Sequence, residues 1–175
     1  MSADARRRRI IITGFMGAGK TTIARALAAR LNCAMVDLDA AIVEQTRRSI
    51  EAIIDEDGEA RFRHIEGEVL RECLAHGDAR LIALGGGTWT LAENRAAIAA
   101  ADCVTVWLDT PFELCWQRIS NASHARPLAR RREHALTLYT ERRAAYELAA
   151  LHIKVHEAQS AEDTAAEIMS RLEPE

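Results

Sequence analysis

GFMGAGKTT, residues 14–22, follows the apolar run IIIT and opens an amphipathic stretch. It fits the pattern G-x-x-x-x-G-K-[ST], with Gly14, Gly19, Lys20 and Thr21 in the fixed positions. A strand before such a loop and a helix after it form the context in which the pattern binds phosphate. The stretch therefore predicts a phosphate-binding loop, or P-loop, at the start of an α/β fold.

The residues of this loop have separate chemical tasks. Glycine lets successive backbone N–H groups converge on phosphate oxygens, and the following helix adds its positive N-terminal end. We expect Lys20 to reach the β- and γ-phosphates of a nucleoside triphosphate, and the Thr21 hydroxyl to bind Mg²⁺. The expected nucleotide contacts within the loop are Gly14, Gly17, Ala18, Gly19, Lys20, Thr21 and Thr22.

Outside the loop, short β-type runs alternate with helical periodicities. The expected strands lie at 10–13, 34–37, 80–84, 103–108 and 152–156. This alternation predicts an α/β protein in which one parallel sheet is covered by helices on both faces. Ser160 and Asp163 resemble a capping box that opens the last helix. A chain of 175 residues is expected to form a single domain over 1–175.

Composition and charge argue against several classes of protein. The chain is 49% hydrophobic and 28% charged, with a net charge of −3, which is ordinary for a globular protein and unfavourable for nucleic-acid binding. No apolar run approaches the ~20 residues that cross a bilayer, and residues 1–12 lack the long apolar stretch and small-residue cleavage site typical of a signal peptide. The four cysteines show no C-x-x-C pair and are expected to be reduced. We expect a cytoplasmic protein without nucleic-acid or membrane partners.

A P-loop alone does not name a reaction, because GTPases, motor ATPases and small-molecule kinases share it. The chain is short and lacks the base-reading N-K-x-D of GTPases. A small kinase acting on a metabolite or nucleotide therefore fits best.

Two carboxylates close the second expected strand, in VDLD. Ligands of an open parallel sheet bind beyond the carboxyl ends of its strands. If the strand continues, the i, i+2 spacing points Asp37 and Asp39 the same way. One can then hold Mg²⁺, and the other can accept a proton or hydrogen bond from an acceptor hydroxyl. The alternative is an acidic helix start before Ala40.

FRHIE, residues 62–66, places Arg63 and Glu66 on one face of an expected helix. An arginine braced by glutamate among apolar residues is a rigid fork for a planar anion such as a carboxylate. A solvated ion pair would explain the spacing equally well. ERRAAYELA, near the end of the chain, offers a second such arginine at Arg142 or Arg143.

LIALGGGTWT, residues 81–90, removes three side chains in a row at the end of the third expected strand. Consecutive glycines cost backbone entropy, which indicates that something approaches the backbone closely. We expect Gly85, Gly86 and Gly87 to let backbone N–H groups touch a compact, hydroxyl-rich acceptor. A loose turn is the alternative.

SNASHARPLARRRE, residues 120–133, is polar and rich in arginine. Long loops without apolar residues to pack are usually functional or disordered. Its place between two helical stretches favours a mobile lid.

In their order and spacing, these motifs together resemble those of shikimate kinase. The resemblance covers nearly the whole chain and rests on GFMGAGKTT, D-x-D at 37–39, F-R-x-x-E at 62–66, GGG at 85–87, R-P-L at 126–128 and R-x-x-x-Y at 142–146. It implies a three-layer P-loop fold of strand order 2-3-1-4-5, with an acceptor-binding region within 34–76 and a lid at 120–133. It also implies an enzyme that uses ATP and Mg²⁺ to phosphorylate the 3-hydroxyl of shikimate in aromatic amino-acid biosynthesis. We expect a monomer, although no motif of the sequence gives the oligomeric state.

The resemblance also implies how the acceptor is bound. Arg63 and Arg142 would clamp the shikimate carboxylate, and Glu66 would brace Arg63. Asp39 and the glycines at 85–87 would hold the ring hydroxyls.

Catalytic roles follow from the same resemblance. Lys20 and the lid residue Arg126 would stabilise charge on the transferring phosphoryl group, and Asp39 would orient and deprotonate the attacking hydroxyl. Thr21 and Asp37 would organise Mg²⁺. Nucleotide contacts beyond the loop are implied for Arg118, which would pack on adenine, and Arg126.

Four features depart from the family pattern. Leu38 stands where Thr or Ser is common, Ala129 where a second Leu is usual in the lid, and Trp89 is a bulky residue after the glycines. The segment after Arg142 also lacks the proline often found before the tyrosine, so Arg142 is favoured over Arg143 by spacing alone. None of these removes a charged group that the chemistry needs.

Two other functions are weighed against this one. A kinase for gluconate would share the P-loop and lid, but it has no evident need for two arginines that grip a carboxylate on a ring. A non-catalytic nucleotide-binding relative would be expected to lack Asp39 or Lys20, and both are present.

Overall fold

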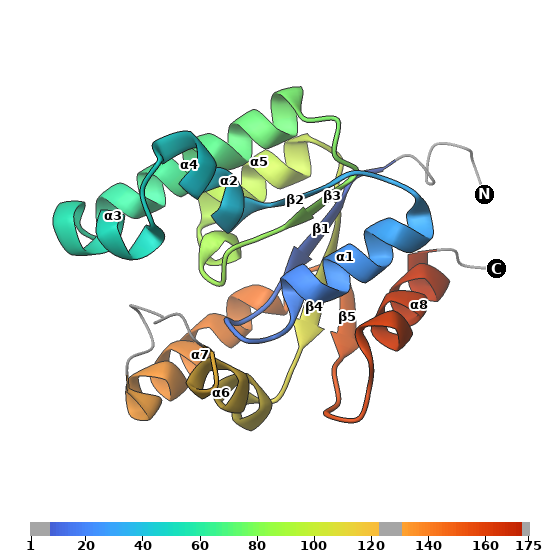
Figure 1. Ribbon diagram of the computed structural model, residues 1–175. Helices are drawn as coiled ribbons and strands as arrows, with labels where there is room; N and C mark the ends of the chain where they lie inside the picture. The colour runs from blue at the N-terminus through green and yellow to red at the C-terminus, as the bar shows by residue number, and fades with distance from the viewer. Residues whose placement is uncertain (1–7, 123–130, 173–175) are drawn as a thin grey trace.

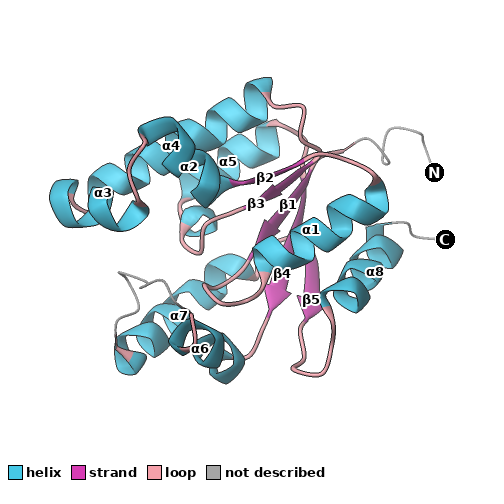
Figure 2. Ribbon diagram, viewed as in Figure 1, coloured by secondary structure: helices cyan, strands magenta, loops and turns pink. Residues whose placement is uncertain are grey.

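The computed structural model describes residues 8–122 and 131–172, which form a parallel sheet with helices on both faces (Figures 1 and 2). The strand order is β2-β3-β1-β4-β5, as expected. The strands are β1 (Ile10–Thr13), β2 (Met35–Asp37), β3 (Leu81–Ala83), β4 (Val104–Asp109) and β5 (Leu151–Lys154). Each expected strand is therefore present, with ends that differ by no more than two residues.

Helices cover both faces of the sheet in the described part of the chain. They are α1 (Lys20–Leu31), α2 (Leu38–Thr46), α3 (Ile50–Asp57), α4 (Glu59–His76), the short 3₁₀ helix η1 (Thr88–Thr90), α5 (Ala92–Ala100), α6 (Phe112–Ser120), α7 (Arg132–Tyr146) and α8 (Ala161–Leu172). Figure 1 shows α1 and α8 packed together on one face, and α4, α5 and α7 on the other. No described helix has both the length and the apolar character to cross a membrane.

The centre of the sheet is the strand that precedes the P-loop. All four residues of β1 are buried, and they pair with β3 on one side and β4 on the other. A strand buried on both faces reads as a continuous apolar run, which is why IIIT does not alternate. The P-loop therefore starts in the middle of the carboxyl edge of the sheet, between the ends of β3 and β4.

The boundary between β2 and α2 differs from the expectation for Asp37 and Asp39. The strand ends at Asp37, whose Oδ1 accepts a hydrogen bond of 3.2 Å from the backbone N–H of Ala40 and so caps α2. Asp39 lies in the first turn of that helix, where a carboxylate interacts favourably with the helix dipole. The continued strand is therefore wrong, and the alternative of an acidic helix start is correct for the backbone.

Helices α2, α3 and α4 stack beside the β2 edge of the sheet (Figure 1). Leu38, the departure in the middle of D-x-D, is fully buried at the start of α2. Ser49 caps α3 by accepting a hydrogen bond from the backbone of Ala52 at 3.1 Å. These short helices carry one wall of the larger cavity described below.

Candidate active site

The P-loop has the backbone geometry that a phosphate cradle requires. Gly14, Gly17 and Gly19 have φ angles of 145°, 78° and 95°, which favour glycine. At Gly17 a Cβ would also lie 2.6 Å from the carbonyl oxygen of Cys115 on α6. The loop ends at Gly19, the N-cap of α1, so the helix N-terminus faces the space enclosed by the loop.

A cavity of about 260 Å³ opens over this loop. Lys20 and Arg118 both line it. Lys20 Nζ donates to the carbonyl oxygen of Phe15 at 2.9 Å, and Arg118 Nη1 donates to that of Gly17 at 3.2 Å. Both cations therefore lie against the loop that the sequence assigns to the nucleotide.

Thr21 and Asp37, the pair expected to organise Mg²⁺, lie in contact. The Thr21 hydroxyl donates to Asp37 Oδ2 at 2.5 Å, joining the first turn of α1 to the end of β2. A Mg²⁺ ion bound with nucleotide takes one or two protein oxygens and completes its shell with phosphate and water. This donor set fits that requirement.

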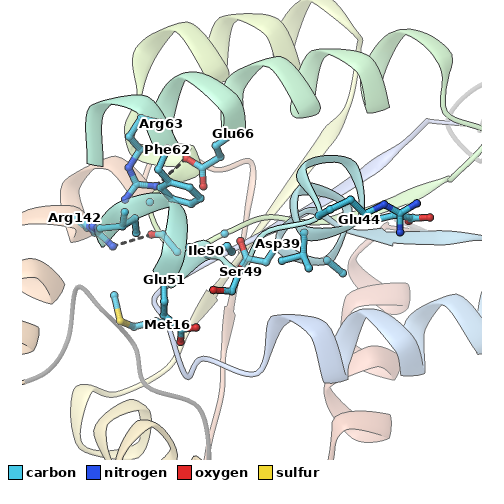
Figure 3. Close-up of a pocket in the computed structure, with 17 residues that line it drawn as sticks. Met16, Asp39, Glu44, Ser49, Ile50, Glu51, Phe62, Arg63, Glu66 and Arg142 are labelled. Atoms are coloured by element: carbon cyan, nitrogen blue, oxygen red, sulfur yellow. Dashed lines mark hydrogen bonds and ion pairs between the residues drawn. The ribbon is translucent and has the colours of Figure 1, made fainter. Parts of the chain in front are cut away.

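A second cavity, of about 810 Å³, lies between the P-loop, the end of β3 and helices α2 to α4 (Figure 3). Its polar lining includes Asp39, Arg63, Glu66 and Arg142, together with the backbone of 85–87. Its outer wall comes from α2, α3 and α4 and the turn between α2 and α3. This wall mixes apolar and polar side chains: Ala40, Val43, Ile50, Ile54 and Phe62 with Glu44, Arg47, Ser49 and Glu51.

Arg63 and Glu66 form an ion pair on α4, beside the cavity, with the glutamate buried and the arginine partly exposed. Arg63 Nη1 donates to Glu66 Oε2 at 2.8 Å, and Nη2 donates to Glu59 Oε1 at 3.1 Å. Burial alone would lower the pKa of Arg63, but the charges and hydrogen bonds of Glu66 and Glu59 outweigh it and raise the pKa. Arg63 is therefore a fixed cation, and the solvated-pair alternative is wrong because Glu66 is 0% exposed.

The motif ERRAAYELA left Arg142 and Arg143 as alternatives, and the structure distinguishes them. Arg142 is 9% exposed, lines the larger cavity and donates from Nη1 to the carbonyl oxygen of Gly86 at 3.3 Å. Arg143 lies over the ring of Trp107 and pairs with both carboxylate oxygens of Asp109, at 3.0 and 3.3 Å. Arg142 is therefore the arginine that faces the cavity, near Arg63 at the same end of it (Figure 3).

The three consecutive glycines are explained by the side chains around them. A Cβ on Gly85 would lie 2.7 Å from Glu66 Oε1 and 2.8 Å from Asp39 Oδ1, and one on Gly87 would lie 2.6 Å from Arg63 Cζ. Neither glycine has a positive φ, so close approach is the reason for them and the loose-turn alternative is wrong. The expected close approach to this backbone is confirmed, but the groups that approach it are the site's own charged side chains. Contact of these glycines with an acceptor stays a prediction.

The two cavities meet at one place. Met16, Asp39 and Gly86 line both of them. The backbone links the two sides as well, because a Cβ on Gly86 would lie 3.1 Å from the backbone nitrogen of Met16 in the P-loop. A phosphate tail in one cavity and an acceptor in the other would face each other across Asp39.

Comparison with known proteins agrees with this geometry. The shikimate kinase family model matches residues 16–173. The chain is 37% identical to a shikimate kinase of Nostoc punctiforme, over 91% of this chain and 88% of the relative. The chain belongs to the shikimate kinase family.

Solved structures of the family superpose closely on this chain. The shikimate kinase of Acinetobacter baumannii in complex with shikimate gives a TM-score of 0.85 at 32% identity, covering 94% of this chain and 92% of that one. The Bacteroides thetaiotaomicron enzyme gives 0.85 at 28% identity, covering 94% and 98%. The three-layer fold of the family is therefore the fold of this chain.

Sequence reasoning missed several residues of this family site. Glu59 is a second partner of Arg63, and Thr88 donates to Glu66 Oε1 at 2.6 Å. The hydroxyl position of Thr88, directly after the glycines, was the available signal. Trp89 lies outside both cavities, buried, with its indole N–H donating to the carbonyl oxygen of Ala145 at 2.8 Å.

Arg126, the proposed lid arginine, lies outside the described residues, as does most of the segment 120–133. Arg118 lies at the edge of the nucleotide cavity, beside Gly17 and Gly19. Gly14 and Ala18, which were also expected to contact the nucleotide, are buried and do not line its cavity. The other described residues assigned to acceptor, phosphate and Mg²⁺ line one or both of the two cavities.

Proposed function

We propose that this chain carries out the reaction of its family, the transfer of the γ-phosphoryl group of ATP to the 3-hydroxyl of shikimate, at the junction of the two cavities. The observation that carries the proposal is that Asp39 and Gly86 line both cavities while two arginines face the larger one. The reaction needs ATP and the acceptor held with their reacting groups facing each other. The smaller cavity would hold the phosphates of ATP and the larger one the acceptor, and the two cavities meet at Asp39 and Gly86.

The acceptor is held mainly by charge. Arg63 and Arg142 approach from α4 and α7 and take the carboxylate of shikimate between them. A paired guanidinium binds a planar carboxylate through directed, charge-assisted hydrogen bonds, which also orient the ring. With the acid end held there, the ring hydroxyls face Asp39 and the backbone at 85–87.

Asp39 is the group that handles the proton of the attacking hydroxyl. It stands where the two cavities meet, so its carboxylate reaches a hydroxyl that faces the phosphates. Phosphoryl transfer depends mostly on such positioning and on neutralising the charge of the phosphoryl oxygens. Lys20 supplies part of that neutralisation, and we assign the rest to Arg126 from the sequence alone.

Mg²⁺ would be held by Thr21 and Asp37. When bound, it neutralises phosphate charge and shields it from the carboxylates nearby. The Thr21 hydroxyl and Asp37 Oδ2, which are in contact with each other, would bind the ion directly or through water.

We further propose that the protein acts as a single-domain monomer in the cytoplasm. The described groups assigned to the acceptor, the phosphates and Asp39's role meet within a single copy, so these assignments call on no second copy. The acceptor-binding region within 34–76 and the lid at 120–133 remain assignments from the sequence.

A coupled ADP-release assay tests the proposal. Purified protein with ATP and Mg²⁺ is given shikimate, gluconate or no acceptor in parallel reactions. ADP release only with shikimate, with phosphate recovered on the 3-hydroxyl, is the expected result. Release with gluconate, or equal release without acceptor, would overturn the assignment of substrate or of catalysis respectively.

A further inference from the structure

Thr88 lies behind the acceptor cavity and holds its charged wall. The residue is 0% exposed, at the start of η1, and does not line the cavity. Its hydroxyl donates to Glu66 Oε1 at 2.6 Å. We propose that Thr88 is a positioning residue that sets the orientation of Arg63 through Glu66, and so makes the site selective for an acceptor that carries a carboxylate.

Glu66 needs this second partner because it is a fully buried carboxylate. Arg63 holds one oxygen, Oε2, and the Thr88 hydroxyl holds the other, Oε1. A buried charge that lacks hydrogen bonds on part of its surface is costly, and its orientation is not fixed. With both oxygens occupied, the plane of the carboxylate is fixed, and with it the direction from which Arg63 Nη1 donates.

Thr88 is itself fixed by the loop that ends β3. Its backbone N–H donates to the carbonyl oxygen of Gly85 at 3.3 Å, and its carbonyl oxygen accepts from Asn94 Nδ2 at 3.0 Å. The hydroxyl of Thr88 also lies 3.0 Å from the position that a Cβ on Gly85 would take. A relay therefore runs from the buried side chain of Asn94 through Thr88 to Glu66.

The same loop also contacts Arg63, the partner of Glu66. Gly87 lies so close to the guanidinium of Arg63 that a Cβ there would meet Cζ at 2.6 Å. Arg63 is thus confined between the loop at 85–88 and its two carboxylate partners. The loss of the Thr88 hydroxyl would free Glu66 to rotate and would loosen Arg63 without removing any group that touches the acceptor.

This inference rests on the proposed function, because it concerns how the shikimate carboxylate is recognised. Its test compares Thr88→Val, which keeps the shape and removes the hydroxyl, with Thr88→Ser, which keeps the hydroxyl. Thr164→Val is the matched control. Thr164 is 1% exposed, and its hydroxyl donates at 3.0 Å within the N-terminal turn of α8, away from both cavities.

The expected result is a change in KM for shikimate rather than in kcat. Thr88→Val should raise that KM about tenfold, as expected when a partner of a charged binding group is lost, and should leave kcat and the Kd for ATP within about twofold. Thr88→Ser and Thr164→Val should both resemble the unaltered protein. The methyl ester of shikimate, which lacks the negative charge, should show nearly the same KM with Thr88→Val as with the unaltered protein.

Three results would contradict the inference. An unchanged KM for shikimate in Thr88→Val, an equal rise for the ester, or no rescue by Thr88→Ser would each overturn it. Should Thr88→Val fail to fold, Thr88→Ala takes its place with the same expected ratio of KM values. If the unaltered protein does not phosphorylate shikimate at all, the proposed function fails, and the role of Thr88 in it fails too.

Discussion

At the scale of residues, the site is a set of charged groups whose partners determine their roles. Arg142 and Arg143 are adjacent in sequence, yet one faces the acceptor cavity and the other pairs with Asp109. The sequence predicted an arginine of the acceptor site at this point of the chain. Its side-chain chemistry could not decide between Arg142 and Arg143, because both are arginines on the same helix, α7. The direction of each side chain depends on the packing of α7 against η1 and β4.

This difference gives a matched pair of variants. Arg142→Ala should raise the KM for shikimate ten- to a hundredfold, since a lost charge-assisted contact costs about 1.5–3 kcal/mol. Arg143→Ala should change that KM less than about threefold, because the exposed pair that it breaks contributes only ~1 kcal/mol or less. Steady-state kinetics at saturating ATP separates the two, and a larger effect from Arg143 would show that the clamp is misassigned.

Asp39 allows a second prediction at this scale. Asp39→Asn keeps the size of the side chain but removes the negative charge that accepts the hydroxyl proton. We expect kcat to fall by about 10²–10⁴, the usual contribution of a positioned base. The Kd for ATP, measured by calorimetry, should stay within about threefold. Near-normal turnover in Asp39→Asn would exclude the proposed role.

At the scale of elements, the sequence predicted strands and helices well and failed where local capping decides. All five strands were predicted because apolar β-type runs are a strong signal in a parallel sheet. The direction of the chain after β2 was not predicted correctly. Asp37 both ends the strand and caps α2, so Asp39 lies in the helix and not in a continued strand. The site still forms, because a helix start delivers Asp39 to the same edge of the sheet.

The capping box of α8 was predicted and is present. Ser160 Oγ accepts from the backbone of Asp163 at 3.0 Å, and Asp163 Oδ2 accepts from the backbone of Ser160 at 3.3 Å. The Ser160 hydroxyl also pairs with that carboxylate at 2.6 Å, and these hydrogen bonds hold the pKa of Asp163 below its usual range. The signal was local, which is why sequence alone sufficed.

Ser160→Ala should therefore destabilise the protein without touching the reaction. The loss of an N-cap costs about 1 kcal/mol, which lowers the Tm of a chain of this size by roughly 2–4 °C. The KM values for both substrates should not change, because α8 packs on α1 and β5 and lies outside both cavities. Thermal unfolding and kinetics on one preparation would check this, and a change in KM would contradict the separation of α8 from the site.

At the scale of the whole molecule, the strand order places the site. The ends of β2, β1 and β3 lie side by side in the sheet and supply Asp37, the P-loop and the glycine loop. The family resemblance implied this order, and the structure confirms it. The position of Thr88 after the glycines could have marked it as a residue near the site, but its contact with Glu66 on α4 follows from no local pattern, because the two residues lie on different elements.

The interior of the molecule also predicts its behaviour at high pH. Burial raises the pKa of Cys115, on α6 behind the P-loop, from 9.0 to about 12. Between pH 9 and pH 12 the thiol stays protonated in the folded state but loses its proton in the unfolded chain. The free energy of unfolding is therefore unaffected by this thiol below pH 9 and falls as the pH rises toward 12. The slope is at most about 1.4 kcal/mol per pH unit for one group.

Urea unfolding from pH 8 to pH 10.5 under reducing conditions would measure this loss. Cys115→Ala should show a shallower decline of the free energy of unfolding than the unaltered protein, whatever its stability at pH 8. Parallel declines in the two proteins would mean that other groups account for the alkaline loss.

The central claim is that shikimate and ATP meet at Asp39 with the acid end of shikimate between two arginines. A crystal structure of the protein with shikimate, Mg²⁺ and a non-hydrolysable ATP analogue tests it most directly. We expect the carboxylate between Arg63 and Arg142, and the 3-hydroxyl beside Asp39 and facing the γ-phosphate. A carboxylate bound away from these arginines, or a 3-hydroxyl that faces away from the nucleotide, would contradict the account.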